Sequence, residues 1–227
     1  QAPYARVPLA DGTLVATAEM PDADMIPHML AASDVLGTGW YAAVAAQVRN
    51  GGTAVVVGDG AVGLMGVLAA KELGAERIIA MSRHATRQSL ARAFGATDIV
   101  AERGAEGIAR VKELTGGVGA ESVLECVGMA ASMEQAMGVC RPGGTIGYVG
   151  VPHGVSFDGQ QLFFAQHRML GGPAPVRRFL PDLMDRVLKG TIQPGKVFDL
   201  TLPLAQVAEG YKAMDERRAI KTLLKVD

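Results

Sequence analysis

A glycine-rich run, GDGAVG at residues 58–63, has the spacing of a phosphate-binding turn. In the pattern GxGxxG the first glycine permits a tight turn, the second lets a pyrophosphate approach the backbone, and the third lets a helix pack closely on its strand. N–H groups at the start of that helix then bind the phosphates, helped by the helix dipole. The run therefore predicts a dinucleotide site formed by Gly58, Gly60, Ala61 and Gly63.

Whether this run is a phosphate-binding turn depends on the elements around it, because a chain with 29 glycines can match the pattern by chance. A β-branched strand is expected at residues 53–58 and a helix at 61–73. Further strands are expected at 77–81, 97–100, 122–127 and 145–151, helices at 86–94, 108–114 and 132–140, and a turn at 141–144. Strands separated by single helices imply parallel pairing and right-handed crossovers, hence an α/β fold with a doubly wound parallel sheet of the Rossmann type. This context favours cofactor binding over a purely structural glycine turn.

The residues after the second strand bear on which form of the cofactor is bound. Turns of this kind that bind NAD carry an acidic residue about 20 positions further on, which accepts hydrogen bonds from the adenosine ribose. Here the strand ends in Ser82, Arg83 and His84, Arg87 follows one turn later, and no carboxylate is present. The small Ser82 leaves room for a 2′-phosphate, and the Arg83 guanidinium can make charge-assisted hydrogen bonds to it. The sequence favours NADP(H) over NAD(H). The alternative is a solvated helix start, although basic residues are unfavourable there.

The two ends of the chain break the alternation of strands and helices. Residues 4–15 have a β-like pattern with a turn at 11–12. Helices at 175–189 and 204–217 flank short strands at 198–202 and 220–226. We therefore assign both ends to another domain.

The composition excludes several function classes. With a formal net charge of −1, no global field attracts nucleic acid or an anionic membrane. The apolar runs fall short of the roughly 18 to 20 residues of a spanning helix, so no transmembrane segment is expected. Gln1 is not an initiator methionine and no leader pattern follows it, so the front of the chain looks cut. Cys126 and Cys140 have no CxxC spacing, which favours buried inert thiols and a reducing, cytoplasmic setting.

With these residues in hand, the chain resembles the zinc-type medium-chain dehydrogenase/reductase family, the alcohol dehydrogenases, over essentially its whole length. The motifs that carry the resemblance are DVLGTGW at 34–40, GDGAVG at 58–63, FGAT at 94–97, ECVG at 125–128 and VGVP at 149–152. The resemblance implies that residues 1–34 are the tail of a GroES-like catalytic domain. Residues 35–174 would be the dinucleotide-binding Rossmann domain, and 175–227 the segment that returns to the catalytic domain. The other zinc ligands of the family would all precede Gln1.

The resemblance also implies roles for individual residues. Asp34 falls at the position of a catalytic zinc ligand, and a carboxylate oxygen is a competent ligand for zinc. The alternative is that Asp34 caps a helix beginning near Val35. Thr38 matches a catalytic-site residue that packs beside the nicotinamide.

Further positions would line the cofactor groove. These are Val62 in the glycine turn and, at the ends of later strands, Val127, Gly128, Val149, Gly150 and Val151. Lys221 falls where the family often places a basic residue facing the pyrophosphate, and a solvated charge is the alternative.

The implied reaction is hydride transfer between NADP(H) and a small-molecule alcohol, aldehyde or ketone, assisted by zinc in the complete enzyme. The resemblance also predicts a homo-oligomer, and we expect this chain alone to be inactive. One alternative is a zinc-independent quinone or enoyl reductase of the same superfamily, against which the GDGAVG turn and Asp34 argue. Another is a cofactor-binding fragment without catalysis.

Overall fold

The computed structural model describes residues 1–226, which form two compact units. The sheet unit comprises residues 38–175. The terminal unit joins residues 1–37 to the segment that begins at Val176. Within residues 1–226 every helix is too short or too polar to span a lipid bilayer.

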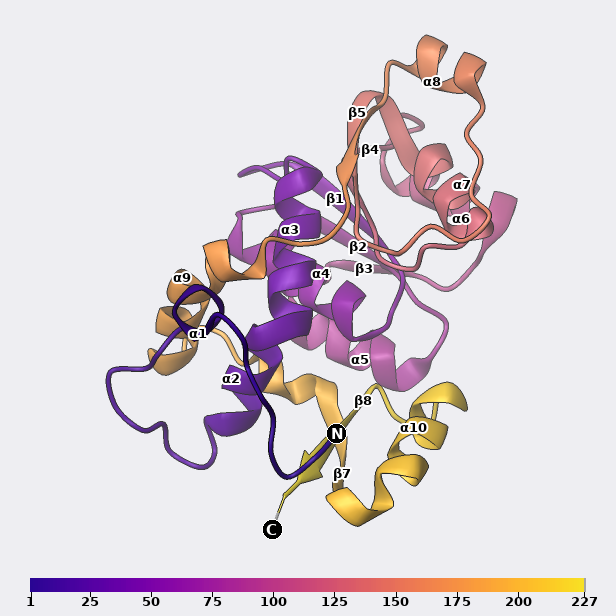
Figure 1. Ribbon diagram of the computed structural model, residues 1–227. Helices are drawn as coiled ribbons and strands as arrows, with labels where there is room; N and C mark the ends of the chain where they lie inside the picture. The colour runs from indigo at the N-terminus through magenta and orange to yellow at the C-terminus, as the bar shows by residue number, and fades with distance from the viewer. Residues whose placement is uncertain (227) are drawn as a thin grey trace. The chain divides into compact units, whose positions relative to one another are not determined.

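The sheet unit is built on a parallel sheet of six strands. Figure 1 shows this sheet with helices packed around it. In chain order the strands are β1 (Thr53–Val57), β2 (Arg77–Met81), β3 (Asp98–Val100), β4 (Ala120–Glu125), β5 (Cys140–Tyr148) and β6 (Arg168–Gly171). Their spatial order is β3-β2-β1-β4-β5-β6, and every pairing is parallel. This is the order of the dinucleotide-binding fold, and the predicted doubly wound sheet is confirmed.

Helices connect successive strands of this sheet. They are α4 (Ala61–Glu72), α5 (Ala85–Phe94), α6 (Gly104–Leu114), α7 (Ala130–Val139) and α8 (Gly159–Ala165). Helix α4 packs beside α5, and α6 beside α7. Right-handed crossovers with this strand order place the two pairs on opposite faces of the sheet. The core between them is aliphatic, with Val55, Ile79, Val123 and Ile146 fully buried.

The sheet differs from the prediction at β5. The run RPGG at 141–144 belongs to the strand rather than to a turn before it. The pairing passes from Ala120 with Cys140 to Ser122 with Thr145, so the extra residues form an irregularity in the strand. Strand β5 ends at Tyr148 and β4 at Glu125, which leaves residues 126–128 and 149–151 in the loops that follow.

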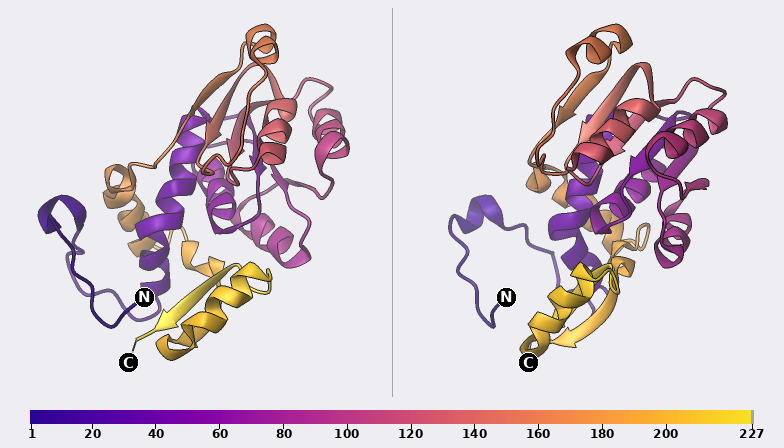
Figure 2. Two further views of the ribbon diagram at one scale, coloured as in Figure 1. Left: turned by 45° about the vertical axis from the view of Figure 1, so that its right-hand side comes forward. Right: turned by 90° about the vertical axis from the view of Figure 1, so that its right-hand side faces the viewer.

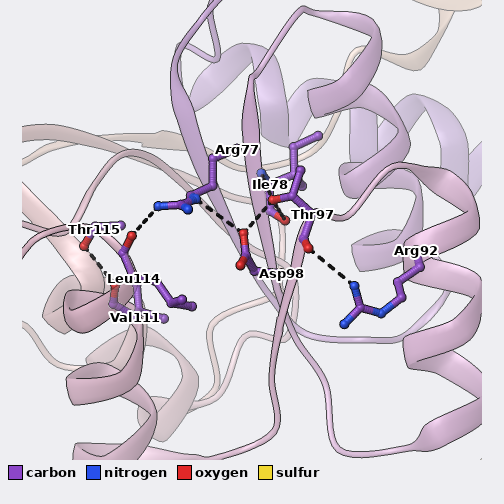
Figure 3. A network of polar contacts seen from close by, with 8 residues as sticks. All are labelled: Arg77, Ile78, Arg92, Thr97, Asp98, Val111, Leu114 and Thr115. Atoms are coloured by element: carbon purple, nitrogen blue, oxygen red, sulfur yellow. Dashed lines mark hydrogen bonds and ion pairs between the residues drawn. The ribbon is translucent and has the colours of Figure 1, made fainter.

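Polar contacts tie β2 to β3 at their amino ends (Figure 3). Arg77 Nε lies 3.3 Å from Asp98 Oδ2, and the Arg77 guanidinium also donates to the Leu114 carbonyl. The Thr97 hydroxyl accepts from the Ile78 N–H at 3.0 Å. These contacts lie at the amino edge of the sheet, opposite to the edge where parallel strands present ligand sites.

The terminal unit combines both ends of the chain. Its elements are α1 (Ala10–Thr13), α2 (Ile26–Ala31), the π-helical turn η1 (Ala32–Leu36), the start of α3 (Gly37–Ala45), α9 (Val176–Leu188), the 3₁₀ turns η2 (Pro194–Val197) and η3 (Leu204–Gln206), β7 (Phe198–Pro203), α10 (Val207–Asp215) and β8 (Lys221–Lys225). Strands β7 and β8 pair in parallel, and α10 packs along β8 (Figure 2). The Gly195 N–H donates to His28 Nδ1 at 2.8 Å, which joins the two sequence segments.

The predicted β-structure at residues 4–15 is wrong. The segment contains the short helix α1, and no strand of residues 1–226 pairs with it. A strand needs a partner for its backbone N–H and C=O groups, and a β-like pattern in the sequence cannot supply one. The segment is instead held by contacts such as the Arg177 guanidinium with the Asp11 carbonyl at 3.1 Å.

Candidate functional site

The carboxyl ends of four neighbouring strands lie at one level of the sheet. Val57 pairs with both Met81 and Glu125, and Glu125 pairs with Tyr148. The loops that follow these strands therefore leave the sheet at one edge. In open parallel sheets this edge, where the strand order reverses between β1 and β4, is where ligands bind.

Each glycine of the GDGAVG turn has its own structural reason. Gly58 has φ of +114°, a conformation that side chains disfavour. A Cβ on Gly63 would lie 2.0 Å from the Gly58 carbonyl oxygen, so the third glycine lets α4 approach β1. A Cβ on Gly60 would meet nothing within 4 Å. The turn is open at the position where the motif predicts a pyrophosphate.

Helix α4 begins at this opening without a side-chain cap. Gly60 is its N-cap residue and carries no side chain, and the helix starts at Ala61. Val62 lies in the first turn and is partly exposed. N–H groups of the first turn have no partner within their helix, so an uncapped start presents donors and the positive end of the helix dipole to an anion.

The three polar residues after β2 have different surroundings. Ser82 is buried and donates its hydroxyl to Asp59 Oδ2 at 2.8 Å, and Arg87 NH1 lies 3.2 Å from Asp59 Oδ1. Arg83 is exposed and makes no hydrogen bond or ion pair with other described residues. Sequence reasoning assigned no role to Asp59. An ionisable residue at a variable position of the glycine turn was the available signal.

A buried carboxylate, which the sequence analysis also did not identify, accepts hydrogen bonds from the loop after β4. Glu125 is fully buried, and its Oε1 accepts from the N–H groups of Val127 and Gly128, each at 2.9 Å, and from the Ser132 hydroxyl at 2.7 Å. Its Oε2 is buried without a hydrogen-bond partner in residues 1–226. An acidic residue inside the apolar strand β4 was the sequence signal.

The loops after β4 and β5 touch each other. Gly128 has φ of +87°, and a Cβ there would lie 2.2 Å from the Val151 carbonyl oxygen. The Val149 N–H donates to the Glu125 carbonyl at 2.9 Å, and a Cβ on Gly150 would lie 2.1 Å from the Gly128 nitrogen. Val127 and Val151 are exposed. The structure thus brings the predicted groove residues together at the edge that carries the glycine turn.

Thr38 lies in α3, which crosses α4 closely. A Cβ on Gly39 would lie 2.6 Å from the Gly66 nitrogen, so the glycine is what allows the two helix backbones to meet. Thr38 itself is partly buried.

Asp34 and Lys221 lie together in the terminal unit. Asp34 is in the π-helical turn η1, its side chain is 67% exposed, and its Oδ2 lies 3.7 Å from Lys221 Nζ. The alternative that Asp34 caps a helix at Val35 is wrong, because α2, η1 and α3 follow one another without interruption. Among the described residues no three His, Cys, Asp or Glu side chains gather to hold a metal. A single carboxylate therefore does not fit a zinc ion.

The two cysteines are free and poorly suited to ionise. Burial raises the pKa of the Cys140 thiol to about 12. Desolvation, with the neighbouring Glu125 carboxylate, raises the pKa of Cys126 well above its ordinary value. Because the thiolate is the reactive form, neither residue is a candidate nucleophile.

Known proteins are similar to this chain in sequence and in fold. A family model described as zinc-binding dehydrogenase matches residues 61–188. Zinc-type alcohol dehydrogenase B of Aspergillus flavus is 32% identical over 233 residues, which cover 99% of this chain and 54% of that protein. The NADP-dependent isopropanol dehydrogenase of Clostridium beijerinckii is 32% identical over 81% of this chain and 52% of its own length. Alcohol dehydrogenase TADH from Thermus sp. ATN1 has a similar structure, with a TM-score of 0.82 at 32% identity over 88% of this chain and 60% of that one. The chain spans about half the length of the curated relatives it matches.

Proposed function

Because this chain belongs to the zinc-binding dehydrogenase family, we propose that it is the cofactor-holding part of an oxidoreductase. The reaction is hydride transfer between NADP(H) and a small-molecule alcohol, aldehyde or ketone. The observation that carries the proposal is the glycine turn, with open space at Gly60 and an uncapped helix behind it, at the carboxyl edge of the sheet.

Different groups of this chain bind different parts of the cofactor. Donors at the start of α4, with the helix dipole, bind the pyrophosphate. Val127, Val149 and Val151 form an apolar wall that keeps water from the nicotinamide end, and Thr38 packs beside the ring. The cofactor supplies the hydride chemistry at its nicotinamide ring.

Residues 1–226 do not complete a zinc site, so none of them is given a zinc-dependent role on its own. Asp34 would be one ligand at most in the complete enzyme. Tight zinc binding takes about four ligands in a fixed geometry, and we expect the 227-residue chain to bind no stoichiometric zinc. Elemental analysis of the purified chain checks this, and one tightly held zinc per chain would contradict it.

The preference for NADP(H) is supported by Arg83. Its guanidinium follows β2 directly, is exposed, and has no partner among residues 1–226, so it is available to a 2′-phosphate. The Clostridium beijerinckii relative, whose name includes NADP dependence, is consistent with this preference.

Calorimetric titration of the Arg83→Ala variant tests the preference. A charge-assisted hydrogen bond contributes about 1.5 to 3 kcal/mol, so NADPH affinity should fall about tenfold or more while NADH affinity is unchanged. Arg92→Ala, which removes an exposed arginine from α5, is the matched control. Tighter binding of NADH than of NADPH by the parent chain would refute the preference. Ser82→Asp is a poor probe because it would place a second carboxylate beside Asp59.

A further inference from the structure

A carboxylate from the glycine turn reaches the end of the neighbouring strand. Asp59 directly follows Gly58, and its Oδ2 accepts from the Ser82 hydroxyl at 2.8 Å. Its Oδ1 lies 3.2 Å from Arg87 NH1, and the side chains of Asp59 and Arg87 are each only 10% exposed. The pairing of Val57 with Met81 in register is what brings the two strand ends together.

These contacts change the chemistry available to a ligand at the end of β2. The single Ser82 proton is donated to Asp59, so the Ser82 oxygen can only accept from a ligand. The charge of Arg87 is balanced by Asp59 in a mostly buried ion pair. The Ser82 oxygen and the Asp59 carboxylate can both accept a hydrogen bond from a ribose hydroxyl. A 2′-phosphate needs hydrogen-bond donors instead, and neither of these two groups can donate.

Fold stability is a weak explanation for this arrangement. The desolvation cost of a buried ion pair often cancels its Coulomb energy, so such a pair is poor evidence for a stabilising role. The sheet has a further ion pair between the ends of β2 and β3, Arg77 with Asp98, at the amino edge where no ligand is expected (Figure 3). The Asp59 cluster differs because it lies on the residues that the glycine motif assigns to the cofactor.

We propose that Asp59 is a specificity-determining residue of the dinucleotide site. Its carboxylate stands in for the missing acid at the end of β2, accepts from the adenosine ribose, and opposes a 2′-phosphate that Arg83 attracts. The balance of Asp59 against Arg83 sets the ratio of the two cofactor affinities. This inference rests on the proposed function, since it requires that a nicotinamide dinucleotide binds.

The test is titration of NADPH and NADH against the full chain and its Asp59→Asn variant. Asparagine keeps the shape and an acceptor for Ser82 but removes the charge. A unit charge near the phosphate acts at an effective dielectric constant of about 20, so the preference for NADPH over NADH should rise about tenfold or more. Asp59→Ser should shift the ratio the same way, and Asp59→Glu, which keeps the charge, should not. Asp98→Asn, which removes the carboxylate of the amino-edge pair, should leave the ratio unchanged.

The outcomes separate this inference from the function it rests on. If the parent chain binds both cofactors and neither Asp59→Asn nor Asp59→Ser changes the ratio by more than about twofold, the role of Asp59 is refuted and the dinucleotide site stands. If the parent chain binds neither cofactor, the proposed function and the role of Asp59 both fall. Thermal unfolding identifies a variant that has lost its fold, in which case the other charge-removing variant decides.

Discussion

A Gly60→Val variant should lose NADPH affinity by about a hundredfold or more while the chain remains folded. The bulky side chain would fill the space where the pyrophosphate approaches the turn and would remove two or more charge-assisted hydrogen bonds, each of about 1.5 to 3 kcal/mol. The fold has room for the change, because a Cβ on Gly60 meets nothing within 4 Å and its φ is ordinary at −74°. Valine is a poor N-cap residue, so a cost of up to about 1 kcal/mol is expected.

Calorimetric titration together with thermal unfolding measures both effects. Gly60→Ala should lie between the parent chain and the valine variant in affinity. Gly12→Val, which adds the same side chain at another open glycine, should bind NADPH as the parent does. Unchanged affinity in Gly60→Val would show that the phosphates lie elsewhere.

Gly63, in the same turn as Gly60, is required for packing. Its Cβ would lie 2.0 Å from the Gly58 carbonyl oxygen, and a backbone atom cannot move aside as a flexible side chain can. The third glycine of the motif thus serves the packing of α4 on β1, whereas the second is the one that we propose to serve the ligand. For this reason Gly60, and not Gly63, is the position at which binding can be separated from folding.

The Glu125→Ala variant should be destabilised by about 3 to 5 kcal/mol. The substitution leaves the N–H groups of Val127 and Gly128 without the acceptor they share, and each unsatisfied buried donor costs about 1 to 3 kcal/mol. The Ser132 hydroxyl can still donate to the Met129 carbonyl, which lies at 2.8 Å. At about 2 to 4 °C per kcal/mol, the unfolding temperature should fall by about 6 to 20 °C.

Two matched variants interpret that result. Glu125→Gln keeps an acceptor oxygen and should lose less stability than Glu125→Ala. Glu134→Ala removes an exposed carboxylate from α7 and should unfold with the parent chain. If Glu125→Ala were as stable as Glu134→Ala, the carboxylate would not be holding the loop after β4.

Local sequence patterns were sufficient to predict the sheet and the glycine turn. The run at 53–57 is β-branched and the glycines that follow it have fixed spacing, so strand, turn and helix are each specified by neighbours along the chain. Their alternation was sufficient to predict parallel pairing. Because parallel strands end at the same edge of a sheet, the loops after β1, β2, β4 and β5 were expected to lie together at that edge.

Local patterns failed where a segment depends on distant partners. Residues 4–15 have a β-like pattern, but no strand of residues 1–226 pairs with them, and α1 forms instead. The run RPGG was expected to turn, but it lies inside β5 as an irregularity between the pairs Ala120–Cys140 and Ser122–Thr145. A helix cap at Asp34 was plausible from Ser33 and Asp34 alone, yet the helical backbone passes through both.

The sequence by itself predicted which edge of which sheet would hold a dinucleotide, because strand propensity and glycine spacing are properties of neighbouring residues. Only the tertiary structure decided which charges meet at that edge. Asp59 and Ser82 are 23 positions apart, and Asp59 and Arg87 are 28 apart. They meet because β1 and β2 pair in one particular register, which no local pattern encodes. The same holds for Glu125, whose burial follows from the layers packed around β4 and not from the residues on either side of it.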